Sequence, residues 1–309
     1  MKIAYFGSSY FAKVVLQKLI SYGREPSLII TTPDRPAGRG LELRATAVKE
    51  LAMKENKEIL TPSSLTDDSF IRRLKDEQCD LFVVVSYGKI IPKVILDFPR
   101  VMCLGLHPSL LPLYRGAAPI NWAIINGEEI SGVTVFRVEE KLDSGAIILQ
   151  KKILIRRDSD AVNLSWRLSV FSAAVLLQGI DSIEKEDFSL TPQDEALVSF
   201  APKLKKGDGR IDWQKHASSI RNLVRGLRGW PEAFTYYKNF MLKIIEVEVD
   251  ENNLVFPPGT VARVSFDSID IACGQGVVKI KKVKPQGKKE MPAQAFLCGY
   301  HIRAGERLG

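Results

Sequence analysis

The first two-thirds of the chain alternate short apolar runs with stretches whose apolar residues recur at helical spacing. Residues 2–7 form the first apolar run, and apolar residues between 11 and 22 then fall on one helix face. The same alternation predicts strands at 28–32, 81–86, 103–107, 132–138 and 147–155, and helices at 47–56, 67–77, 119–125 and 159–177. This order is typical of an α/β fold with a doubly wound, mostly parallel, Rossmann-like sheet.

The final third follows a different pattern. A helical stretch at 217–227 precedes short β-like runs that are separated by turn residues. These runs lie at 240–249, 259–265, 269–273, 277–283 and directly before Gly305. Short strands at this spacing predict a small C-terminal β-barrel, for which the nucleic-acid-binding OB-fold is one candidate.

The two patterns meet at residues 203–209, a polar, basic segment that contains two glycines. Such a composition is typical of a linker. We therefore expect one domain over 1–202, a linker over 203–209 and a second domain over 210–309.

The composition is that of a globular protein and argues against several other classes. Hydrophobic residues make up 45% and charged residues 26% of the 309 positions, which is unlike a disordered chain, a collagen-like repeat or a disulfide scaffold. No apolar run reaches the length of a membrane span, and the first residues lack the apolar core of a signal peptide. The four cysteines form no CxxC pair. We expect a cytoplasmic protein with reduced thiols and no membrane partner.

The net charge of +8 is confined to the final third. Residues 203–309 hold 19 Lys and Arg against 11 Asp and Glu, whereas the preceding residues hold equal numbers of each sign. A basic domain attached to a neutral one suggests an anionic macromolecule, most simply a nucleic acid, as its partner. Ordinary solubilising charge is the alternative, and charge alone does not separate the two.

Two common nucleotide sites are not indicated by the motifs. The first strand ends in Gly7-Ser8-Ser9, with one glycine where a dinucleotide fingerprint has three, and no Walker A sequence occurs. We therefore expect no nicotinamide cofactor and neither ATP nor GTP, and we predict no metal site.

The densest group of unusual residues lies between Gly105 and Gly145 and contains His107, one of three histidines. His107 follows an apolar strand, which places it where open α/β sheets bind ligands. It is either a catalytic acid or electrostatic partner, or a core histidine bonded to a backbone carbonyl. Asp143 lies in Asp-Ser-Gly, which by itself signals a turn. Together the two suit a pair in which a carboxylate orients a protonated imidazole, chemistry that fits acyl transfer to an amine.

Several motifs together resemble one family. They are Gly7-Ser-Ser-Tyr-Phe-Ala12, Thr32-Pro-Asp-Arg-Pro-Ala-Gly-Arg-Gly40, Ser86-Tyr-Gly-Lys-Ile-Ile-Pro92, His107-Pro-Ser-Leu-Leu-Pro-Leu-Tyr-Arg-Gly-Ala-Ala-Pro119, Gly132-Val-Thr134, Leu142-Asp-Ser-Gly145, Arg210-Ile-Asp-Trp213, Gly229-Trp-Pro231 and Pro258-Gly-Thr260. On these residues the chain resembles the methionyl-tRNA formyltransferases, a family that uses 10-formyltetrahydrofolate. The resemblance spans essentially the whole chain.

The resemblance implies a formyltransferase domain over 1–202 and a tRNA-binding domain over 210–309. It implies transfer of a formyl group from 10-formyltetrahydrofolate to methionyl initiator tRNA in translation initiation, and we expect a monomer. His107 and Asp143 are carried over as catalytic residues. The folate residues are Ser86, Tyr87, Gly88, Lys89, Ile90, Ser109, Leu110, Leu111, Pro112 and Leu142. The residues expected to face tRNA are Arg35, Arg39, Arg44, Lys203, Lys205, Lys206, Lys281, Lys282, Lys284, Lys288 and Lys289.

One departure from the family concerns catalysis. The family has an asparagine two residues before the histidine, and Gly105 occupies that position here. Such an amide donates to the formyl oxygen, and the loss of one oxyanion donor typically costs about 10²- to 10³-fold in rate. Three explanations stay open: a change that disables the enzyme, a variant in which water or another amide such as Asn121 donates, or a protein that keeps the fold without the activity.

Two alternative functions also stay open. A formyltransferase acting on a small amine, such as an amino sugar nucleotide or glycinamide ribonucleotide, has little use for a basic C-terminal domain. A non-catalytic relative that binds tRNA or folate is compatible with Gly105. Steep salt dependence of binding separates tRNA from a small amine, and a measurable formylation rate excludes the non-catalytic relative.

Overall fold

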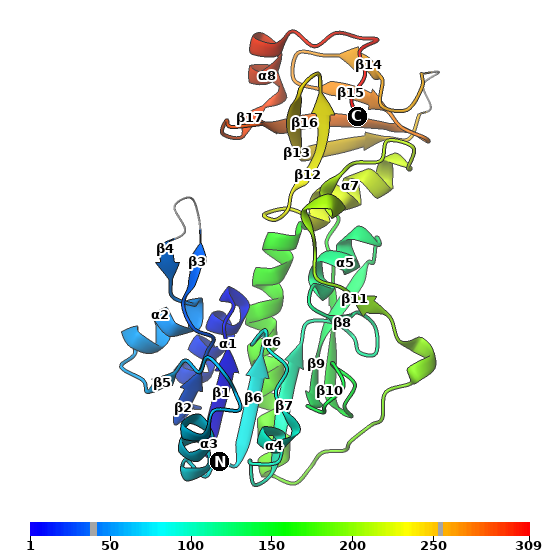
Figure 1. Ribbon diagram of the computed structural model, residues 1–309. Coiled ribbons are helices and arrows are strands. Elements are labelled where there is room, and N and C mark those ends of the chain that lie inside the picture. The colour runs from blue at the N-terminus through cyan, green and yellow to red at the C-terminus, as the bar shows by residue number, and fades with distance from the viewer. Residues whose placement is uncertain (38–41, 253–255) are drawn as a thin grey trace. The chain divides into compact units, whose positions relative to one another are not determined.

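The computed structural model describes residues 1–37, 42–252 and 256–309 and divides into two compact units. Unit 1 comprises residues 1–119, 130–154 and 165–202, and unit 2 comprises residues 120–129, 155–164 and 203–309. Figure 1 shows the helices and strands of both units.

Unit 1 is built on a seven-stranded sheet with the order β10-β9-β7-β6-β1-β2-β5. Strands β5, β2, β1, β6 and β7 are parallel, whereas β9 is antiparallel to both β7 and β10. The central strands are buried on both faces, which explains their nearly continuous apolar sequences. The strands are β1 (Ile3–Gly7), β2 (Leu28–Ile30), β5 (Ile59–Leu60), β6 (Leu81–Val85), β7 (Met102–His107), β9 (Ile130–Arg137) and β10 (Ile147–Leu154).

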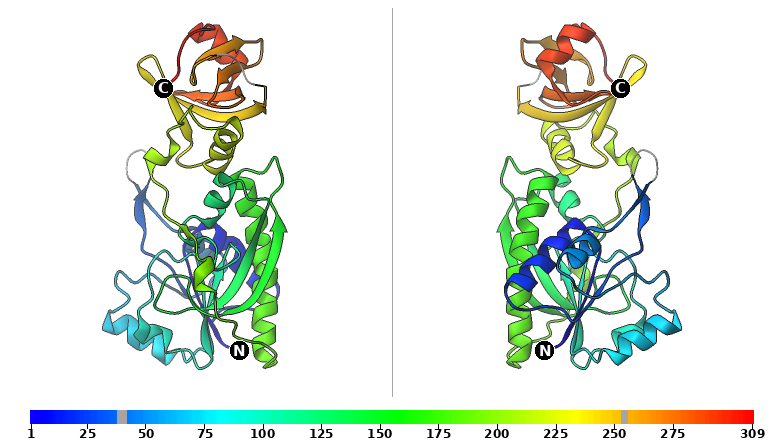
Figure 2. Two further views of the ribbon diagram at one scale, coloured as in Figure 1. Left: turned by 90° about the vertical axis from the view of Figure 1, so that its right-hand side faces the viewer. Right: turned by 90° about the vertical axis from the view of Figure 1, so that its left-hand side faces the viewer.

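Helices cover both faces of this sheet (Figure 2). The hydroxyl of Tyr5 donates to the carbonyl of Ala12 in α1 at 2.7 Å, whereas Phe6 packs in one cluster with Phe70 and Leu74 of α3. Because neighbouring residues of a strand point to opposite faces, α1 and α3 lie on opposite sides of the sheet. The helices within residues 1–202 are α1 (Tyr10–Ser21), α2 (Ala47–Lys54), α3 (Asp68–Asp76), α4 (Lys93–Leu96), α5 (Pro119–Ile125) and α6 (Ala161–Glu184). Residues 120–125 of α5 and 161–164 of α6 are part of unit 2.

Two pairs of short strands complete unit 1. Strands β3 (Arg35–Ala37) and β4 (Glu42–Arg44) are antiparallel. Strands β8 (Arg115–Gly116) and β11 (Phe200–Ala201) are parallel, and the 3-10 helix Glu195–Leu197 precedes β11. The pairing of β8 with β11 joins the segment after His107 to a segment beyond α6.

Unit 2 contains an antiparallel sheet with the order β12-β13-β16-β15-β14, and β17 pairs with β16. Its core includes Trp213 and Ile220, the sheet residues Leu242 and Ile280, and Phe296. The elements are a 3-10 helix (Lys206–Gly209), α7 (Ala217–Gly226), β12 (Ala233–Tyr237), β13 (Phe240–Asp250), β14 (Val261–Val264), β15 (Ile269–Ala272), β16 (Val277–Pro285), β17 (Met291–Pro292) and α8 (Ala293–Tyr300).

The predicted fold class is confirmed, because a mostly parallel α/β sheet is accompanied by a small antiparallel β sheet. The prediction of a strand directly before Gly305 is wrong, since residues 293–300 form α8. The segment contains the good helix formers Ala293, Gln294, Ala295 and Leu297, and the helix buries Ala293 and Phe296 against the sheet. Strand β12 is a further strand that the apolar pattern does not indicate, and α6 extends to Glu184 rather than ending near 177.

Candidate active site

His107 is the last residue of β7 and is only 6% exposed. Its Nε2 atom lies 2.8 Å from the carbonyl oxygen of Tyr114. Because a carbonyl oxygen only accepts, Nε2 carries a hydrogen in this arrangement. The structure therefore contains the backbone contact expected of a core histidine, and the contacts of the other ring nitrogen bear on whether it is also catalytic.

Asp143 lies in the loop between β9 and β10, and the fold brings it to His107. Its Oδ2 atom lies 3.6 Å from Nδ1 of His107 and accepts a hydrogen bond of 2.9 Å from the backbone nitrogen of Gly116. Asp143 also has a positive φ of 52°, as a turn residue does. The predicted turn and the predicted pairing with the imidazole thus occur at the same residue.

Thr134 orders the backbone that follows His107. Its hydroxyl donates to the carbonyl of Ser109 at 2.7 Å, and it accepts from the backbone nitrogen of Leu111 at 3.1 Å and from Gln150 at 2.9 Å. Thr134 is fully buried and pairs directly with His107 across β7 and β9. Its role is not predicted from the sequence, although a polar residue inside an apolar strand is a signal that a backbone group needs a partner.

Gly105 lies on the same face of β7 as His107, two residues earlier. Its partner on β9 is Phe136, which is 4% exposed. A Cβ atom at position 105 would collide with the Phe136 ring. The aromatic ring therefore occupies the space that a side chain at position 105 requires, and this part of the site is apolar.

Asn121, the alternative amide donor, lies in unit 2. Its Nδ2 atom donates to the carbonyl of Gly226 at 2.8 Å. This bond engages the Asn121 amide within its own unit. The structure of unit 2 thus gives Asn121 a local role in packing α5 against the end of α7.

The predicted folate residues fall into two groups in unit 1. Tyr87 belongs to one apolar cluster with Cys103 of β7 and with Val138, so its ring packs on the same sheet face as His107. Within this group Ile90 is 75% exposed, and Leu142 in the Asp143 loop is 57% exposed. Both are available to an apolar ligand.

The second group, residues 109–112, is turned largely inward. Ser109 and Leu111 are buried, and the Ser109 hydroxyl donates to the carbonyl of Leu113 at 2.6 Å. Pro112 and Leu110 are half-buried. In the structure, the side chains of Ser109 and Leu111 thus support the loop from within.

Tyr87 is 2% exposed, and its hydroxyl has no hydrogen-bond partner among the described residues. Burial raises the pKa of Tyr87 to about 12. Close by in sequence, Lys89 donates to the carbonyl of Ser63 at 2.9 Å, which ties residues 86–90 to the segment before α3. The segment is therefore held in place by a lysine bonded to the backbone and by a buried ring.

An open cavity of about 720 Å³ lies in unit 1 beside the Asp143 loop. It is bordered by two stretches of chain, one from Lys93 to Cys103 and one from Arg137 to Lys141. Acidic, basic and apolar side chains all contribute to its wall. None of the predicted folate residues lines it, although Lys93 follows shortly after Ile90 and Lys141 directly precedes Leu142.

Two of the three arginines expected to face tRNA lie opposite each other. Arg35 of β3 and Arg44 of β4 are register partners, and both are exposed. Like charges directly across a strand pair repel, so this hairpin favours an anion that neutralises both. Arg39 lies outside the described residues.

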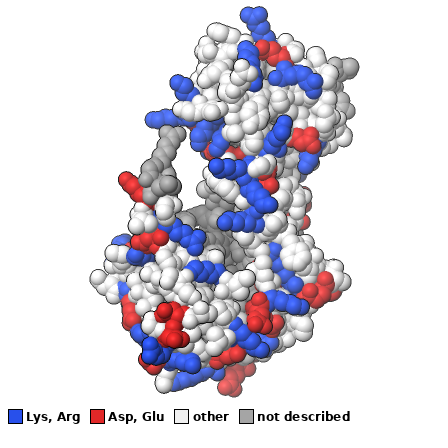
Figure 3. Space-filling view, in the orientation of Figure 1, with Lys and Arg blue, Asp and Glu red and all other residues white. Residues whose placement is uncertain are grey.

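The lysines expected to face tRNA divide into paired and unpaired ones. Lys281 forms an ion pair with Asp267, Lys284 with Glu232 and Lys282, more distantly, with Glu290. In the described part of the chain no ion pair is formed by the exposed residues Lys203, Lys205, Lys206, Lys288 and Lys289. Basic side chains gather over unit 2 on the face shown in Figure 3. The unpaired lysines are the ones whose charge is most available to phosphate.

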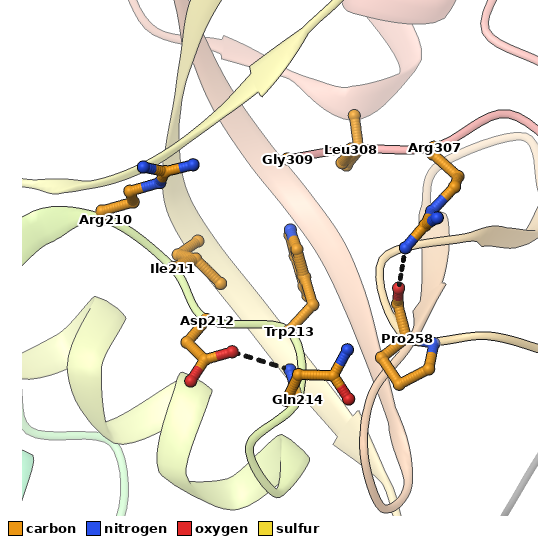
Figure 4. A pocket seen from close by; sticks show the side chains of 9 residues that line it. All are labelled: Arg210, Ile211, Asp212, Trp213, Gln214, Pro258, Arg307, Leu308 and Gly309. Atoms are coloured by element: carbon orange, nitrogen blue, oxygen red, sulfur yellow. Dashed lines mark hydrogen bonds between the residues drawn. The ribbon is translucent and has the colours of Figure 1, made fainter.

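Two motifs of the final third meet at a second cavity, of about 370 Å³, within unit 2. Arg210 and Arg307 lie on either side of it, with Trp213 between them (Figure 4). The Trp213 indole donates to the Thr235 hydroxyl at 3.1 Å, and Gly259, at a φ of 86°, packs against the indole. The Trp213 and Gly259 motifs thus contact each other within unit 2.

Two further features concern metals and membranes. The part of the chain that the structure describes contains no group of three or more His, Cys, Asp or Glu side chains that could hold a metal ion. Within the same residues, every helix is too short or too polar to cross a bilayer.

Both parts of the sequence match known family models. Residues 1–180 match the model described as formyl transferase, and residues 203–301 match the formyl transferase C-terminal domain. The methionyl-tRNA formyltransferase of Thermodesulfovibrio yellowstonii is 42% identical over 303 residues, which cover 98% of this chain and 97% of that protein. The methionyl-tRNA formyltransferase of Acetivibrio thermocellus is 40% identical over 310 residues and is matched over its whole length.

Solved structures share the fold at lower identity. A sugar 3N-formyltransferase, WlaRD, has a TM-score of 0.67 at 18% identity and is matched over 94% of this chain and 99% of its own. An N-formyltransferase from Helicobacter canadensis has a TM-score of 0.68 at 16% identity, over 91% of this chain and 99% of its own. At these identities the likeness bears on the fold alone.

Proposed function

Because the chain belongs to the methionyl-tRNA formyltransferase family, we propose that it transfers the formyl group of 10-formyltetrahydrofolate to the amino group of methionyl initiator tRNA. The observation that supports the chemistry is the His107–Asp143 pair, with 3.6 Å between Nδ1 and Oδ2 at the end of a sheet strand. The product supports translation initiation, a cytoplasmic process. We propose that the protein acts there as a monomer.

In the proposed reaction, the amine of methionyl-tRNA attacks the formyl carbon and forms a new C–N bond. The tetrahedral intermediate carries an oxyanion, which a protonated His107 stabilises. Asp143, 3.6 Å from Nδ1, orients the imidazole, and water or the Asp143 carboxylate accepts the amine proton. The bond to N10 of the folate then breaks, and N10 takes up a proton.

Gly105 and Phe136 are expected to lower the rate of the chemical step. Gly105 supplies no side-chain donor, and the Phe136 ring fills the neighbouring space. The loss of one oxyanion donor lowers the rate about 10²- to 10³-fold. We therefore expect a chemical step slower by about that factor than in a family member with asparagine at this position.

We propose that the folate lies against residues 86–90 and 109–112 and against Leu142. The exposed side chains of Ile90 and Leu142 offer apolar contact to a ligand. Tyr87, three residues before Ile90, packs in one cluster with Cys103 of β7. The adjoining cavity between Lys93 and Lys141 offers room and hydrogen-bonding groups for the polar heterocycle. In this proposal the side chains of Ser109 and Leu111 act by holding the loop in shape.

We propose that tRNA binds through two basic surfaces, with residues 1–202 as the catalytic domain, 203–209 as a linker and 210–309 as the tRNA-binding domain. One surface is formed by Arg35 and Arg44 of the β3–β4 hairpin. Arg39, which lies outside the described residues, is the third arginine that we propose to contact tRNA. The other comprises the five unpaired lysines of unit 2, whereas Lys281, Lys282 and Lys284 contribute less because acidic neighbours already neutralise them.

The test is single-turnover formylation of methionyl-tRNA with 10-formyltetrahydrofolate. We expect His107→Asn and Asp143→Asn each to remove most of the activity, and His301→Asn and Asp187→Asn, at exposed positions, to leave it unchanged. Full activity in His107→Asn or Asp143→Asn would remove that residue from the mechanism.

The same preparation separates the alternatives. A tRNA enzyme loses affinity for methionyl-tRNA steeply with rising salt, whereas an enzyme for a small amine does not depend on salt in this way. Gly105 favours, as a second candidate, a relative that binds tRNA without catalysis. Salt-dependent tRNA binding with no formylation, even at high enzyme concentration, would establish that candidate instead.

A further inference from the structure

Residues 191–201, which we call the strap, run along the active-site loops of unit 1 after α6 has ended. At one end, Thr191 exchanges two backbone hydrogen bonds, of 2.8 and 2.9 Å, with Ile147 at the start of β10. At the other end, Phe200 and Ala201 form β11 and pair with Arg115 and Gly116. The strap thus connects the loop that carries Asp143 with the segment that follows His107.

Gln193 of the strap uses its amide fully. Its Nε2 atom donates to the carbonyls of Asp143 and Gly145, both at 2.8 Å. Its Oε1 atom accepts from Nη2 and Nε of Arg115, at 2.8 and 3.1 Å. These bonds satisfy both donors and both acceptor positions of a side-chain amide.

Arg115 stands between the two backbone groups that fix the catalytic pair. The carbonyl of the preceding residue, Tyr114, contacts His107, and the backbone nitrogen of the following residue, Gly116, donates to Asp143. The Arg115 side chain is only 5% exposed and also pairs with Glu195. Gln193 therefore links the backbone of Asp143 to Arg115, whose two neighbours in the chain contact His107 and Asp143.

We propose that Gln193 is a positioning residue that sets the placement of Asp143 relative to His107. The effect on catalysis rests on the function proposed above, whereas the effect on the histidine ring does not. Gln193 bonds neither His107 nor the Asp143 carboxylate directly, so it acts through the two loops. A misplacement of reacting groups by about 1 Å lowers rates by as much as 10²-fold.

The strap has other anchors, which makes the role of Gln193 separable from folding. The carbonyl of Ser199 accepts from the Arg115 nitrogen at 2.9 Å, and the Ser199 hydroxyl accepts from the Tyr114 nitrogen at 2.9 Å. The carbonyl of Ala201 accepts from the Ala117 nitrogen at 2.9 Å. Removal of the Gln193 amide thus leaves the strap attached along its length.

Two substitutions test the proposal. Gln193→Met keeps the length of the side chain and removes all of its amide hydrogen bonds. Gln193→Glu keeps an acceptor for Arg115 but brings oxygen instead of N–H groups to the carbonyls of Asp143 and Gly145. Gln17→Met and Gln17→Glu, at an exposed position of α1, are the matched controls.

The first measurement is the ¹⁵N NMR spectrum of the histidine rings in the protein without substrates. The chain has three histidines, so single substitutions assign their signals. We expect both Gln193 variants to shift the His107 ring signals and to leave those of His216 and His301 in place. The Gln17 variants should shift none of the three.

The second measurement is the steady-state kinetics of formylation. We expect kcat to fall by about 10- to 100-fold in both Gln193 variants, with KM for methionyl-tRNA and for the folate within about twofold of the parent protein. The melting temperature of each variant, measured in parallel, shows that it is folded. If Gln193→Met does not fold, Gln193→Glu decides the question.

Unchanged His107 signals in a folded Gln193 variant would overturn the proposal, as would an unchanged kcat in an active preparation. If no variant and not even the parent protein formylates tRNA, the function proposed above fails. A shift of the His107 signals would still support the role of Gln193 in that case, so the two failures are distinguishable.

Discussion

Gly105 and Phe136 form one steric unit across β7 and β9. The ring of Phe136 lies where the first atom of a side chain at position 105 would be placed. Restoring an amide at position 105 therefore requires room as well as the right chemical group. The two positions have to be changed together.

We expect Gly105→Asn alone to lower the free energy of unfolding by about 1–3 kcal/mol, because it overpacks a buried site, and to give little gain in rate. With Phe136→Leu added, the amide has room, and we expect the single-turnover formylation rate to rise by about 10²- to 10³-fold. Phe136→Leu alone is the control and should not raise the rate. A single Gly105→Asn variant that is as stable and as fast as the double variant would contradict the steric coupling.

Two buried tyrosines in unit 1 offer a matched comparison. The Tyr87 hydroxyl has no partner among the described residues, whereas the Tyr5 hydroxyl donates to Ala12 at 2.7 Å. We expect Tyr87→Phe to leave the free energy of unfolding unchanged or to raise it, and Tyr5→Phe to lower it by about 1 kcal/mol because one buried hydrogen bond is lost. Denaturant unfolding of the ligand-free protein measures both. An equal loss in the two variants would show that the Tyr87 hydroxyl has a partner in solution.

Among the elements, the β3–β4 hairpin carries the clearest electrostatic signal. Arg35 and Arg44 repel across the strand pair, and in the described residues neither forms an ion pair. A bound phosphate would remove this repulsion. The hairpin is thus less favourable by itself than in a complex with an anion.

We expect Arg44→Glu to stabilise the hairpin slightly and to weaken binding of methionyl-tRNA. The slope of the logarithm of the binding constant against the logarithm of the salt concentration should become less negative by about 0.7 to 0.9 for each phosphate that the hairpin no longer neutralises. Titrations at several salt concentrations measure this slope. Arg72→Glu, at an exposed position of α3, changes the net charge by the same amount and is the control. Equal effects of the two substitutions would mean that net charge, and not the hairpin, controls binding.

The elements also show what the sequence alone can predict. His107 and β7 are recognisable because an apolar strand ending in a polar residue is a local pattern. The strap is not recognisable in this way, since Gln193 acts through hydrogen bonds to residues far away in the sequence. The local pattern likewise predicts a strand directly before Gly305, whereas the helix at 293–300 is stabilised by burial of Phe296 against residues that are distant in the sequence.

For the molecule as a whole, the ion pairs of Glu77 in unit 1 make the free energy of unfolding sensitive to acid. Glu77 pairs with Lys2 at 2.8 Å and with Arg73 at 2.7 Å. Burial by itself raises the pKa of Glu77, but hydrogen bonds from Lys2, Arg73 and Ser27 outweigh burial and lower the pKa from 4.5 to about 2. Because the pKa in the folded state is the lower one, this contribution to stability is present above about pH 4.5 and is lost as the pH falls towards 2.

We expect Glu77→Gln to lower the free energy of unfolding by about 1–3 kcal/mol at pH 7 and by much less near pH 2. Glu186→Gln, at an exposed position, should change it little at either pH. Denaturant unfolding across this pH range makes the comparison. A loss in Glu77→Gln that is the same at both ends of the range would assign the acid sensitivity to other carboxylates.

The position of the strap in the sequence affects folding during synthesis and the choice of truncation sites. A nascent chain that has left the ribosome as far as Glu184 already contains every strand of the seven-stranded sheet, but it still lacks Gln193 and β11. The sheet can therefore fold before the loops around His107 acquire their last contacts. A fragment designed to isolate the catalytic domain and ended at residue 180, where the family model stops, would lack the strap, whereas one that extends through Ala201 would keep it.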